Sequence, residues 1–299
     1  MPSLKAIRTR IASVKNTQKI TKAMKLVAAA RLRRAQDSML AARPYAKRIA
    51  DVIADIAARS AAAGDELTHP LLTARPIKRA RVIVVSSDRG LAGGYNSNLN
   101  RMIERFMVDQ AGTLPAIDLV TVGRKAREYF KKRAGLVHAT HPFATSETID
   151  SLSAVLADEC TAAFLSEDPA VRVDAVFVAF NEFKSVISQE PHIVQVLPVP
   201  TPPPSAEGKA VNGIDFEYEP SKEAVLAAAL PLYLRVTIRR ALLEAVASFF
   251  GAQMSAMDNA TKNAKEMISS LTLEFNRARQ AAITKELMEI VGGAEALKG

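Results

Sequence analysis

The residues with the clearest chemical potential lie in a glycine-containing stretch, Ser86 to Asn98 (SSDRGLAGGYNSN), between a predicted strand and a predicted helix. Loops in this position often bind phosphate, because free backbone N–H groups favour anions. This loop matches neither GxGxxG nor GxxxxGK followed by Ser or Thr, and it has no lysine to reach a phosphate. Gly90, Gly93 and Gly94 are therefore predicted to shape a tight turn.

Other reactive residue types do not form a site by their spacing. His138 and His141 form HATH, but no third or fourth ligand follows at a metal-like distance. His69, His192, the serines and the acids form no recognisable nucleophile or acid–base group. The sequence thus predicts no catalytic, cofactor-binding or metal-binding residue, and a chain that is not itself an enzyme. The single cysteine, Cys160, excludes an intrachain disulfide, favours a reducing compartment, and is expected to be a small packing residue.

The charge of the chain is concentrated at its N-terminus. The net charge is +9, from 40 basic and 31 acidic residues. No acid occurs before Asp37, whereas ten basic residues do: Lys5, Arg8, Arg10, Lys15, Lys19, Lys22, Lys25, Arg31, Arg33 and Arg34. A helix that needed only solubility would mix both signs. We therefore expect this segment to lie within an acidic or negatively lined protein socket.

The same segment carries a heptad stripe, read by counting alternately three and four residues from Leu4 to Ile56. Ser3 is the predicted N-cap, Pro44 a predicted kink and Gly64 the predicted end. The stripe members are Leu4, Ile7, Ile11, Val14, Gln18, Thr21, Lys25, Ala28, Leu32, Ala35, Met39, Ala42, Ala46, Ile49, Ile53 and Ile56. The polar members Gln18, Thr21 and Lys25 either fix the register of a seam or face a second partner.

A second narrow stripe occupies the last long segment, Met257 to Gly293, which has no proline and no glycine before Gly292. Its members are Met257, Ala260, Ala264, Met267, Leu271, Ala278, Ala281 and Met288. A narrow seam needs a partner helix of comparable length, and the N-terminal segment supplies one. The two segments are therefore predicted to pair as antiparallel helices.

The middle of the chain alternates between strand-like and helix-like patterns. Predicted strands are Arg81–Ser86, Asp118–Val122 and Val173–Phe180, and predicted helices are Asn98–Val108, Arg124–Arg133 and Ile149–Leu165. Lys184 to Pro198 is expected to add one or two strands at the sheet edge, as a hairpin. Ser221 should cap a short helix to about Leu230, with Pro231 in the first turn of a last helix that runs to about Val291. No apolar run is long enough to span a membrane.

The predicted fold is mixed α+β and α/β: a long antiparallel coiled coil of N- and C-terminal helices brackets a small, largely parallel α/β domain. The expected parts are residues 1–63 (first coiled-coil helix), 75–200 (Rossmann-like foot domain), 201–220 (proline-rich linker) and 221–299 (short helix and last coiled-coil helix).

Three segments resemble the gamma subunit of the F-type rotary ATP synthase. They are IASVKNTQKITKAMKLVAAARLRRAQ, SSDRGLAGGYN and AMDNATKNAKEMISSLTLEFNRARQAAITKELMEIVGGAEAL. The resemblance covers both long helices and the first strand–helix unit between them. It implies a central stalk, or rotor, that couples proton transport through the ring of c subunits to ATP synthesis at the alpha and beta subunits.

The resemblance also implies partners and contact residues. One copy of the chain would stand inside the hexamer of alpha and beta subunits, with the epsilon subunit and the c-ring at its foot, and with no nucleic acid. The positions that match the family's contact segments are Met24, Lys25, Arg279, Gln280, Thr284 and Glu286 for the hexamer, and Tyr218 and Glu219 for the ring. Because the motif begins almost at Met1, we expect no presequence and a peripheral position on the cytoplasmic face of a bacterial inner membrane.

One stretch departs from the family pattern. Relatives usually carry an acid and an arginine where this chain has ASFFGAQM, with Phe249, Phe250 and Gln253. Any polar catch is therefore in doubt, and a packed aromatic patch is the physical alternative.

Two other functions remain open from the residues themselves. A nucleic-acid-binding coiled-coil protein would also be basic, although the charges surround the helix and no aromatic residue precedes Tyr45. A nucleotide-dependent enzyme could use the α/β domain.

Overall fold

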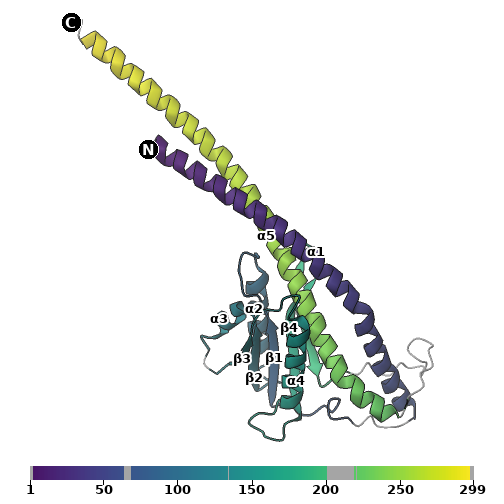
Figure 1. The fold of residues 1–299 in the computed structure, drawn as a ribbon. Coiled ribbons are helices and arrows are strands. Elements are labelled where there is room, and N and C mark those ends of the chain that lie inside the picture. The colour runs from purple at the N-terminus through teal and green to yellow at the C-terminus, as the bar shows by residue number, and fades with distance from the viewer. Residues whose placement is uncertain (1–2, 64–68, 134, 201–218, 220, 297–299) are drawn as a thin grey trace. The chain divides into compact units, whose positions relative to one another are not determined.

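The computed structural model describes residues 3–63, 69–133, 135–200, 219 and 221–296. Two long helices, α1 (Leu4–Ala63) and α5 (Lys222–Ala296), enclose the remaining elements in the sequence (Figure 1). The chain forms two compact units. Met1–Ala28 and Gln253–Gly299 make the first, and Ala29–Ala252 makes the second. Each unit is described by itself.

Helix α1 forms as its stripe predicts. The Ser3 hydroxyl accepts a hydrogen bond from the Ala6 N–H at 3.2 Å, which satisfies one of the free donors of the first turn. The helix continues through Pro44, and every predicted stripe residue from Leu4 to Ile56 is buried or half-buried. The heptad reading of this segment is confirmed.

In the first unit the two helices run antiparallel. Lys25 meets Asp258, Thr21 meets Thr261, and the Arg8 guanidinium lies over the Phe275 ring, so positions earlier in α1 meet positions later in α5. The predicted members Met257, Ala264 and Leu271 are buried in this seam. The predicted antiparallel pairing of the helices is confirmed.

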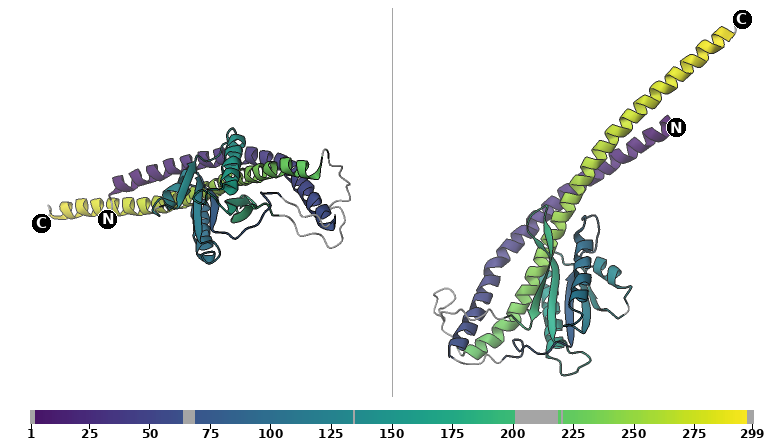
Figure 2. Two further views of the ribbon diagram at one scale, coloured as in Figure 1. Left: turned by 90° about the horizontal axis from the view of Figure 1, so that it is seen from below. Right: turned by 180° about the vertical axis from the view of Figure 1, so that it is seen from behind.

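The predicted burial in the seam is wrong for three stripe members of α5. Met267, Ala281 and Met288 are exposed, and the seam uses the half-buried Ile268 in place of Met267. The last turns of α5 extend beyond the first turn of α1 (Figure 2). Ala281 still lines a groove with Ile7 of α1, but its side chain remains exposed.

The predicted break between a short helix and the last helix is also wrong. Pro231 lies inside a single helix that runs from Lys222 to Ala296. An interior proline removes one N–H donor from the backbone hydrogen bonds, and its ring crowds the carbonyl of the residue four positions earlier. The side chains of Leu226, Leu230 and Leu234 are buried on both sides of Pro231, and this packing keeps the helix continuous.

The second unit contains a five-stranded sheet in the order β3-β2-β1-β4-β5. The strands are β1 (Arg79–Val85), β2 (Ala116–Val122), β3 (Val137–His141), β4 (Ala175–Phe183) and β5 (Gln189–Leu197). The first four are parallel, and β5 pairs antiparallel with β4 as an edge hairpin. The largely parallel sheet is confirmed. Strand β3 was not predicted, because its residues alternate between exposed and half-buried and form no apolar run.

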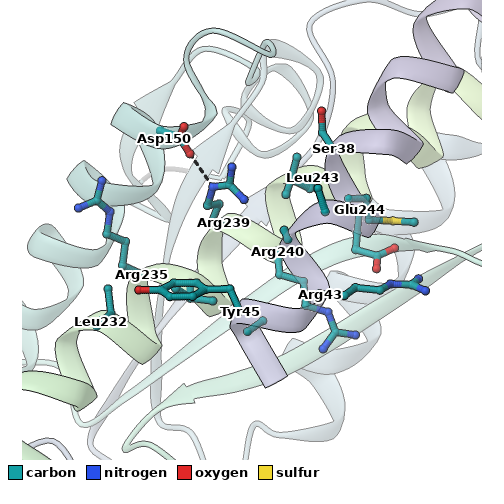
Figure 3. Close-up of a pocket in the computed structure, with 15 residues that line it drawn as sticks. Ser38, Arg43, Tyr45, Asp150, Leu232, Arg235, Arg239, Arg240, Leu243 and Glu244 are labelled. Atoms are coloured by element: carbon teal, nitrogen blue, oxygen red, sulfur yellow. Dashed lines mark hydrogen bonds and ion pairs between the residues drawn. The ribbon is translucent and has the colours of Figure 1, made fainter. Parts of the chain in front are cut away.

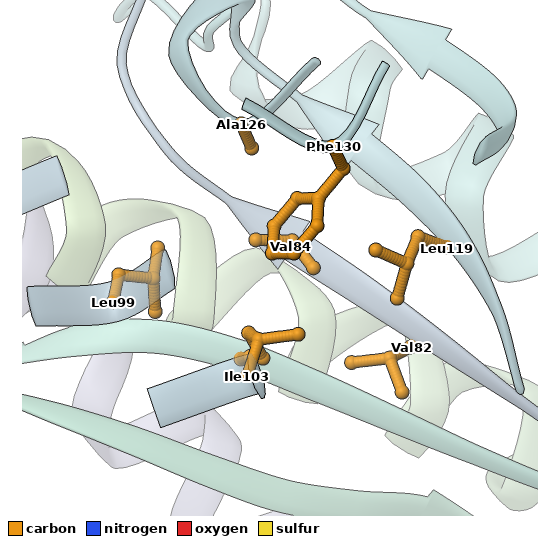
Figure 4. Close-up of a cluster of buried hydrophobic side chains, with 8 residues drawn as sticks. Val82, Val84, Leu99, Ile103, Leu119, Ala126 and Phe130 are labelled. Atoms are coloured by element: carbon orange, nitrogen blue, oxygen red, sulfur yellow. The ribbon is translucent and has the colours of Figure 1, made fainter. Parts of the chain in front are cut away.

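Three shorter helices cover the sheet: α2 (Tyr95–Asp109), α3 (Arg124–Phe130) and α4 (Ile149–Leu165). Val82 and Val84 of β1 point to the face covered by α2 and α3, where Leu99, Ile103 and Phe130 complete a buried cluster (Figure 4). Successive strand residues alternate between faces. Arg81 therefore points to the opposite face, toward Glu159 and Cys160 of α4.

The strand register is specified by a buried ion pair. Arg81 and Asp118 lie directly opposite each other on β1 and β2. The Arg81 Nε and Nη2 atoms each donate to one Asp118 carboxylate oxygen at 3.0 Å, which is a bidentate pair. A slip of one residue would separate the pair and leave the buried Arg81 charge without its partner, so the pair disfavours any other register.

Replacing Gly123 with alanine should destabilise the second unit. Gly123 follows β2 with φ +92, and a Cβ there would lie 2.5 Å from the Ser86 carbonyl oxygen. Such strain costs about 1–3 kcal/mol before the clash is added. Gly123→Ala should therefore lower the Tm measured by tyrosine fluorescence.

The matched control is Gly112→Ala, where the added Cβ meets nothing within 4 Å. This change should shift stability by less than about 0.5 kcal/mol. Equal effects of the two substitutions would contradict the close approach at Gly123.

Candidate functional site

The glycine-containing loop after β1 uses its polar groups within the protein. The Ser86 hydroxyl donates to the Val122 carbonyl at 3.0 Å and accepts from the Ala126 N–H at 2.9 Å. An Asp88 carboxylate oxygen accepts from the Arg124 N–H at 2.8 Å at the start of α3. Gly93 has φ +54, so the predicted tight turn is confirmed at this residue. Leu91, with φ 62, also adopts the left-handed conformation, which the sequence did not indicate.

The crevice where such sheets usually bind ligands is filled by α5. The strand order reverses between β1 and β4, and ligands of open α/β sheets bind beside the carboxyl ends of such strands. Here the Tyr95 hydroxyl donates to the Ala245 carbonyl at 3.0 Å, and the Ser248 hydroxyl donates to the Asn181 carbonyl at 2.7 Å. Burial raises the pKa of Tyr95. This position therefore serves as a socket for a helix.

The aromatic patch predicted in ASFFGAQM is confirmed. The Phe249 ring is 6% exposed and contacts the rings of Tyr95, Phe143 and Phe250 edge-on, at centroid distances of 5.3–5.6 Å. The Arg31 guanidinium lies 5.7 Å from the centroid of the Phe250 ring. Edge-on pairs of this kind add about 0.5–1.5 kcal/mol each beyond area burial. The patch thus anchors α5 to the sheet domain by packing.

The residues considered for metal or thiol chemistry lie in packing positions. His141 Nε2 is 3.2 Å from Glu159 Oε2, which joins β3 to α4. Cys160 is buried as predicted, and burial raises its pKa to about 12. At neutral pH the thiol is therefore protonated and shielded from solvent.

A polar layer crosses the seam of the first unit. Lys25 Nζ is 2.6 Å from the nearer Asp258 carboxylate oxygen, and Lys262 reaches the other oxygen at 2.9 Å. One turn away, the Thr261 hydroxyl lies 2.8 Å from the Thr21 hydroxyl. Polar pairs in an apolar seam favour one register, because any slip leaves them unpaired. The sequence left two roles open for Thr21 and Lys25: fixing the register of the seam or facing a second partner. These contacts support the first role.

The outer surface of α1 is positively charged. Of the ten basic residues before Asp37, Lys25 is half-buried and the other nine are exposed. Within the described part of the chain, none of those nine has an ion-pair partner. The helix therefore offers uncompensated positive charge around its circumference, which suits an acidic surrounding surface.

The end of α5 carries exposed apolar side chains. They are Ile283, Leu287, Met288, Ile290 and Val291, which are between 49% and 69% exposed. Contiguous exposed apolar surface marks an interaction site more often than scattered apolar residues do. This surface, residues 283–291, is called the α5 tip.

The predicted contact residues separate into three groups. Met24 and Lys25 are half-buried in the seam, and Lys25 is engaged by Asp258. Arg279, Gln280, Thr284 and Glu286 are exposed at or next to the α5 tip. Glu219 is exposed, and Tyr218 lies outside the described residues.

Comparison with known proteins decides the family. A family model described as ATP synthase matches residues 3–297. The chain is 53% identical over 298 residues to the ATP synthase gamma chain of Anaeromyxobacter sp. strain K, and 46% identical over 299 residues to that of Geobacter sp. strain M21, with full coverage of every chain. The chain belongs to the ATP synthase gamma chain family.

Solved structures agree with the fold of this family. The central stalk of the Tetrahymena thermophila mitochondrial ATP synthase is 22% identical, with a TM-score of 0.60, over 81% of this chain and 99% of that one. The rotor of the Euglena gracilis enzyme is 16% identical, with a TM-score of 0.62, over 94% and 98%. The nucleic-acid-binding alternative is not supported by these relatives. No described helix has an apolar stretch long enough to cross a membrane.

Sequence reasoning identified the α1 side of the polar layer but not its α5 side. Asp258 and Thr261 lie beside the predicted seam members Met257 and Ala260, so the stripe alone did not mark them. A search for an acid opposite the predicted polar position Lys25 could have found Asp258, once antiparallel pairing was assumed.

Removing the Lys25 charge should destabilise the first unit at neutral pH. The hydrogen bonds from Lys25 and then Lys262 lower the pKa of Asp258. A lowered carboxyl pKa contributes stability above the unfolded pKa, and this contribution disappears as the pH falls through the folded pKa. Lys25→Gln should therefore lower the Tm at pH 7, and its difference from the unmodified protein should shrink in acid.

Lys15→Gln provides the control, because Lys15 is an exposed residue of the same helix. It should leave the Tm nearly unchanged at both pH values. A Lys25→Gln effect of constant size from pH 7 to pH 3 would mean that the packing of the side chain matters and its ion pair does not.

Proposed function

We propose that this chain is the central rotor shaft of a proton-translocating ATP synthase, with one copy in each complex. Its partners would be the alpha and beta subunits around the coiled coil, and the epsilon subunit and c-ring at the foot. The complex would lie on the cytoplasmic face of a bacterial inner membrane, with this chain bound peripherally. The observation that carries the proposal is the α5 tip, where α5 leaves α1 behind and exposes apolar side chains.

The surfaces of the first unit suit a shaft held inside a sleeve of protein. The α5 tip offers apolar contact, whereas α1 offers charge around its circumference. The polar layer of Lys25, Asp258, Thr21 and Thr261 keeps the two helices from sliding past each other. A shaft whose faces differ contacts the three catalytic conformations differently in each orientation, and this difference in free energy couples rotation to catalysis.

The second unit suits a non-catalytic foot. Its ligand crevice is occupied by Ala245 and Ser248 of α5, and its loop after β1 binds neighbouring backbone groups. In this proposal, residues 1–63 and 221–299 belong to the coiled coil, residues 75–200 form the foot, and residues 201–220 are a linker. Met24, Lys25, Arg279, Gln280, Thr284 and Glu286 would contact the hexamer, and Tyr218 and Glu219 the ring.

Mixing the chain with separately expressed alpha and beta subunits should produce a complex with one copy of the chain per hexamer. The purified complex should hydrolyse ATP much faster than the alpha–beta mixture, while the chain alone should be inactive. Subunit stoichiometry and ATPase rate in the eluted fractions provide the measurement. Separate elution of the chain, or a complex with no gain of activity, would reject the shaft function.

A pair of arginine variants tests the contact residues. Arg279 and Arg277 are both exposed and two residues apart on α5, so their side chains lie on opposite sides of the helix. Arg277 lines a groove beside Ile7 of α1. Arg279→Ala should reduce the ATPase rate of the assembled complex several-fold, because it removes a contact to the hexamer. Arg277→Ala should leave the rate nearly unchanged, and equal effects of the two would contradict the assignment.

A further inference from the structure

A groove lies between the two long helices inside the second unit, away from the sheet crevice. It is bounded by residues 38–46 of α1 and 232–244 of α5, and Asp150 of α4 closes one side. Its volume is about 670 Å³, within the range of about 300–1,000 Å³ typical of sites for small molecules. Its apolar lining comes from Met39, Ala42, Ala46, Leu232, Val236 and Leu243 (Figure 3).

Positive charge exceeds negative charge around this groove. Four arginines line it: Arg43, Arg235, Arg239 and Arg240. Arg239 is paired with Asp150 at 2.5 Å. Among the described residues, Arg43, Arg235 and Arg240 have no ion-pair partner within 4 Å. At least three guanidinium groups therefore remain available to an anion.

Two carboxylates, those of Asp150 and Glu244, line the groove beside the four arginines. Glu244 is 2% exposed, and its Oε2 accepts from the Phe183 N–H at 3.1 Å. Glu182 is paired with Lys184 at 2.9 Å. Lys184 is the main cause of the lowered pKa of Glu182, with smaller contributions from His192 and Arg240. None of these acids forms an ion pair with Arg43 or Arg240 in the described chain.

The arrangement favours a ligand with an anionic group at one end and a flat, apolar group at the other. In Figure 3, Arg43 comes from α1 and Arg240 from α5, and both lie away from the Arg239–Asp150 pair. Guanidinium groups match phosphate oxygens with paired hydrogen bonds. The Tyr45 ring, whose side chain is 55% exposed, reaches from α1 toward Leu232 and offers a flat surface beside the apolar lining.

We propose that this groove binds a nucleoside di- or triphosphate. The phosphates would bind Arg43 and Arg240, and the base would lie on the Tyr45 ring and the apolar lining. Because the two arginines belong to different helices, a bound nucleotide would join α1 to α5 within the second unit. This site is separate from the filled sheet crevice and does not depend on the rotor function.

The test is isothermal titration calorimetry of the full chain at physiological salt with ATP, ADP, adenosine, inorganic phosphate and a lysophosphatidate. ATP should bind saturably with one site per chain. Arg43→Gln/Arg240→Gln should weaken ATP binding by about tenfold or more, because charge-assisted hydrogen bonds are lost. Arg101→Gln/Arg105→Gln removes the same charge from the exposed surface of α2 and should change ATP affinity by less than about twofold.

A second measurement does not depend on the arginine variants folding. Azido-ATP should photolabel the unmodified chain within residues 38–46 or 232–244, and excess ATP should prevent labelling. Tyr45→Leu should weaken ATP binding while leaving the weak binding of inorganic phosphate unchanged.

Three outcomes would overturn the proposal. They are absence of saturable ATP binding, equal losses in the two double variants, and lysophosphatidate binding more tightly than ATP through the same arginines. The second would indicate general attraction of anions to a protein of net charge +9, and the third would assign the groove to a lipid headgroup.

Discussion

The structure depends on the fact that a very long helix with a narrow apolar stripe cannot bury that stripe alone. Helices α1 and α5 contain 60 and 75 residues, so each is several times longer than the average helix of a globular protein. Each therefore requires a partner along its length. Apolar seam residues supply the attraction, and the polar layer at Lys25, Asp258, Thr21 and Thr261 selects one register from several with similar apolar contact.

Along its length, α5 meets three different environments, and each has a physical signature in the sequence. Residues 241–249 are buried on all sides, and their polar members Glu244 and Ser248 are satisfied by Phe183 and Asn181. The seam near Met257 and Leu271 buries one stripe only. The α5 tip buries almost nothing, so its apolar side chains remain for a partner. One helix thus combines an anchor, a seam and a free contact surface.

Much of this organisation could be predicted because periodicity reports burial directly. The α1 stripe, the sheet strands with continuous apolar runs and helix α4 followed from the pattern alone. Strand β3 did not, because a short edge strand with alternating exposure has no apolar run. Pro231 suggested a helix start, but packing of Leu226, Leu230 and Leu234 outweighed the lost hydrogen bond and the steric cost of an interior proline. Asp258 was missed because the partner of a polar seam residue depends on register, which one helix cannot reveal.

The candidate contact site was harder to predict from the sequence than the fold, because its exposed surfaces would contact other molecules and not residues of this chain. Sequence patterns located the exposed positions Arg279, Gln280, Thr284 and Glu286 through family resemblance, but nothing within the chain assigns their partners. The filled crevice at Tyr95 and Ala245 likewise required coordinates, since the same strand order elsewhere holds a ligand. The groove between Arg43 and Arg240 also depends on helix pairing that spacing alone does not specify.

Single-molecule observation of rotation tests the central claim most directly. Val108 is 74% exposed on α2, so Val108→Cys would present a reactive thiol, whereas Cys160 is buried with its pKa raised to about 12. A bead attached there, on a complex immobilised through its alpha and beta subunits, should turn continuously in one direction when ATP is added. A bead that stays fixed, or moves equally in both directions while ATP is hydrolysed, would show that this chain is not the rotor.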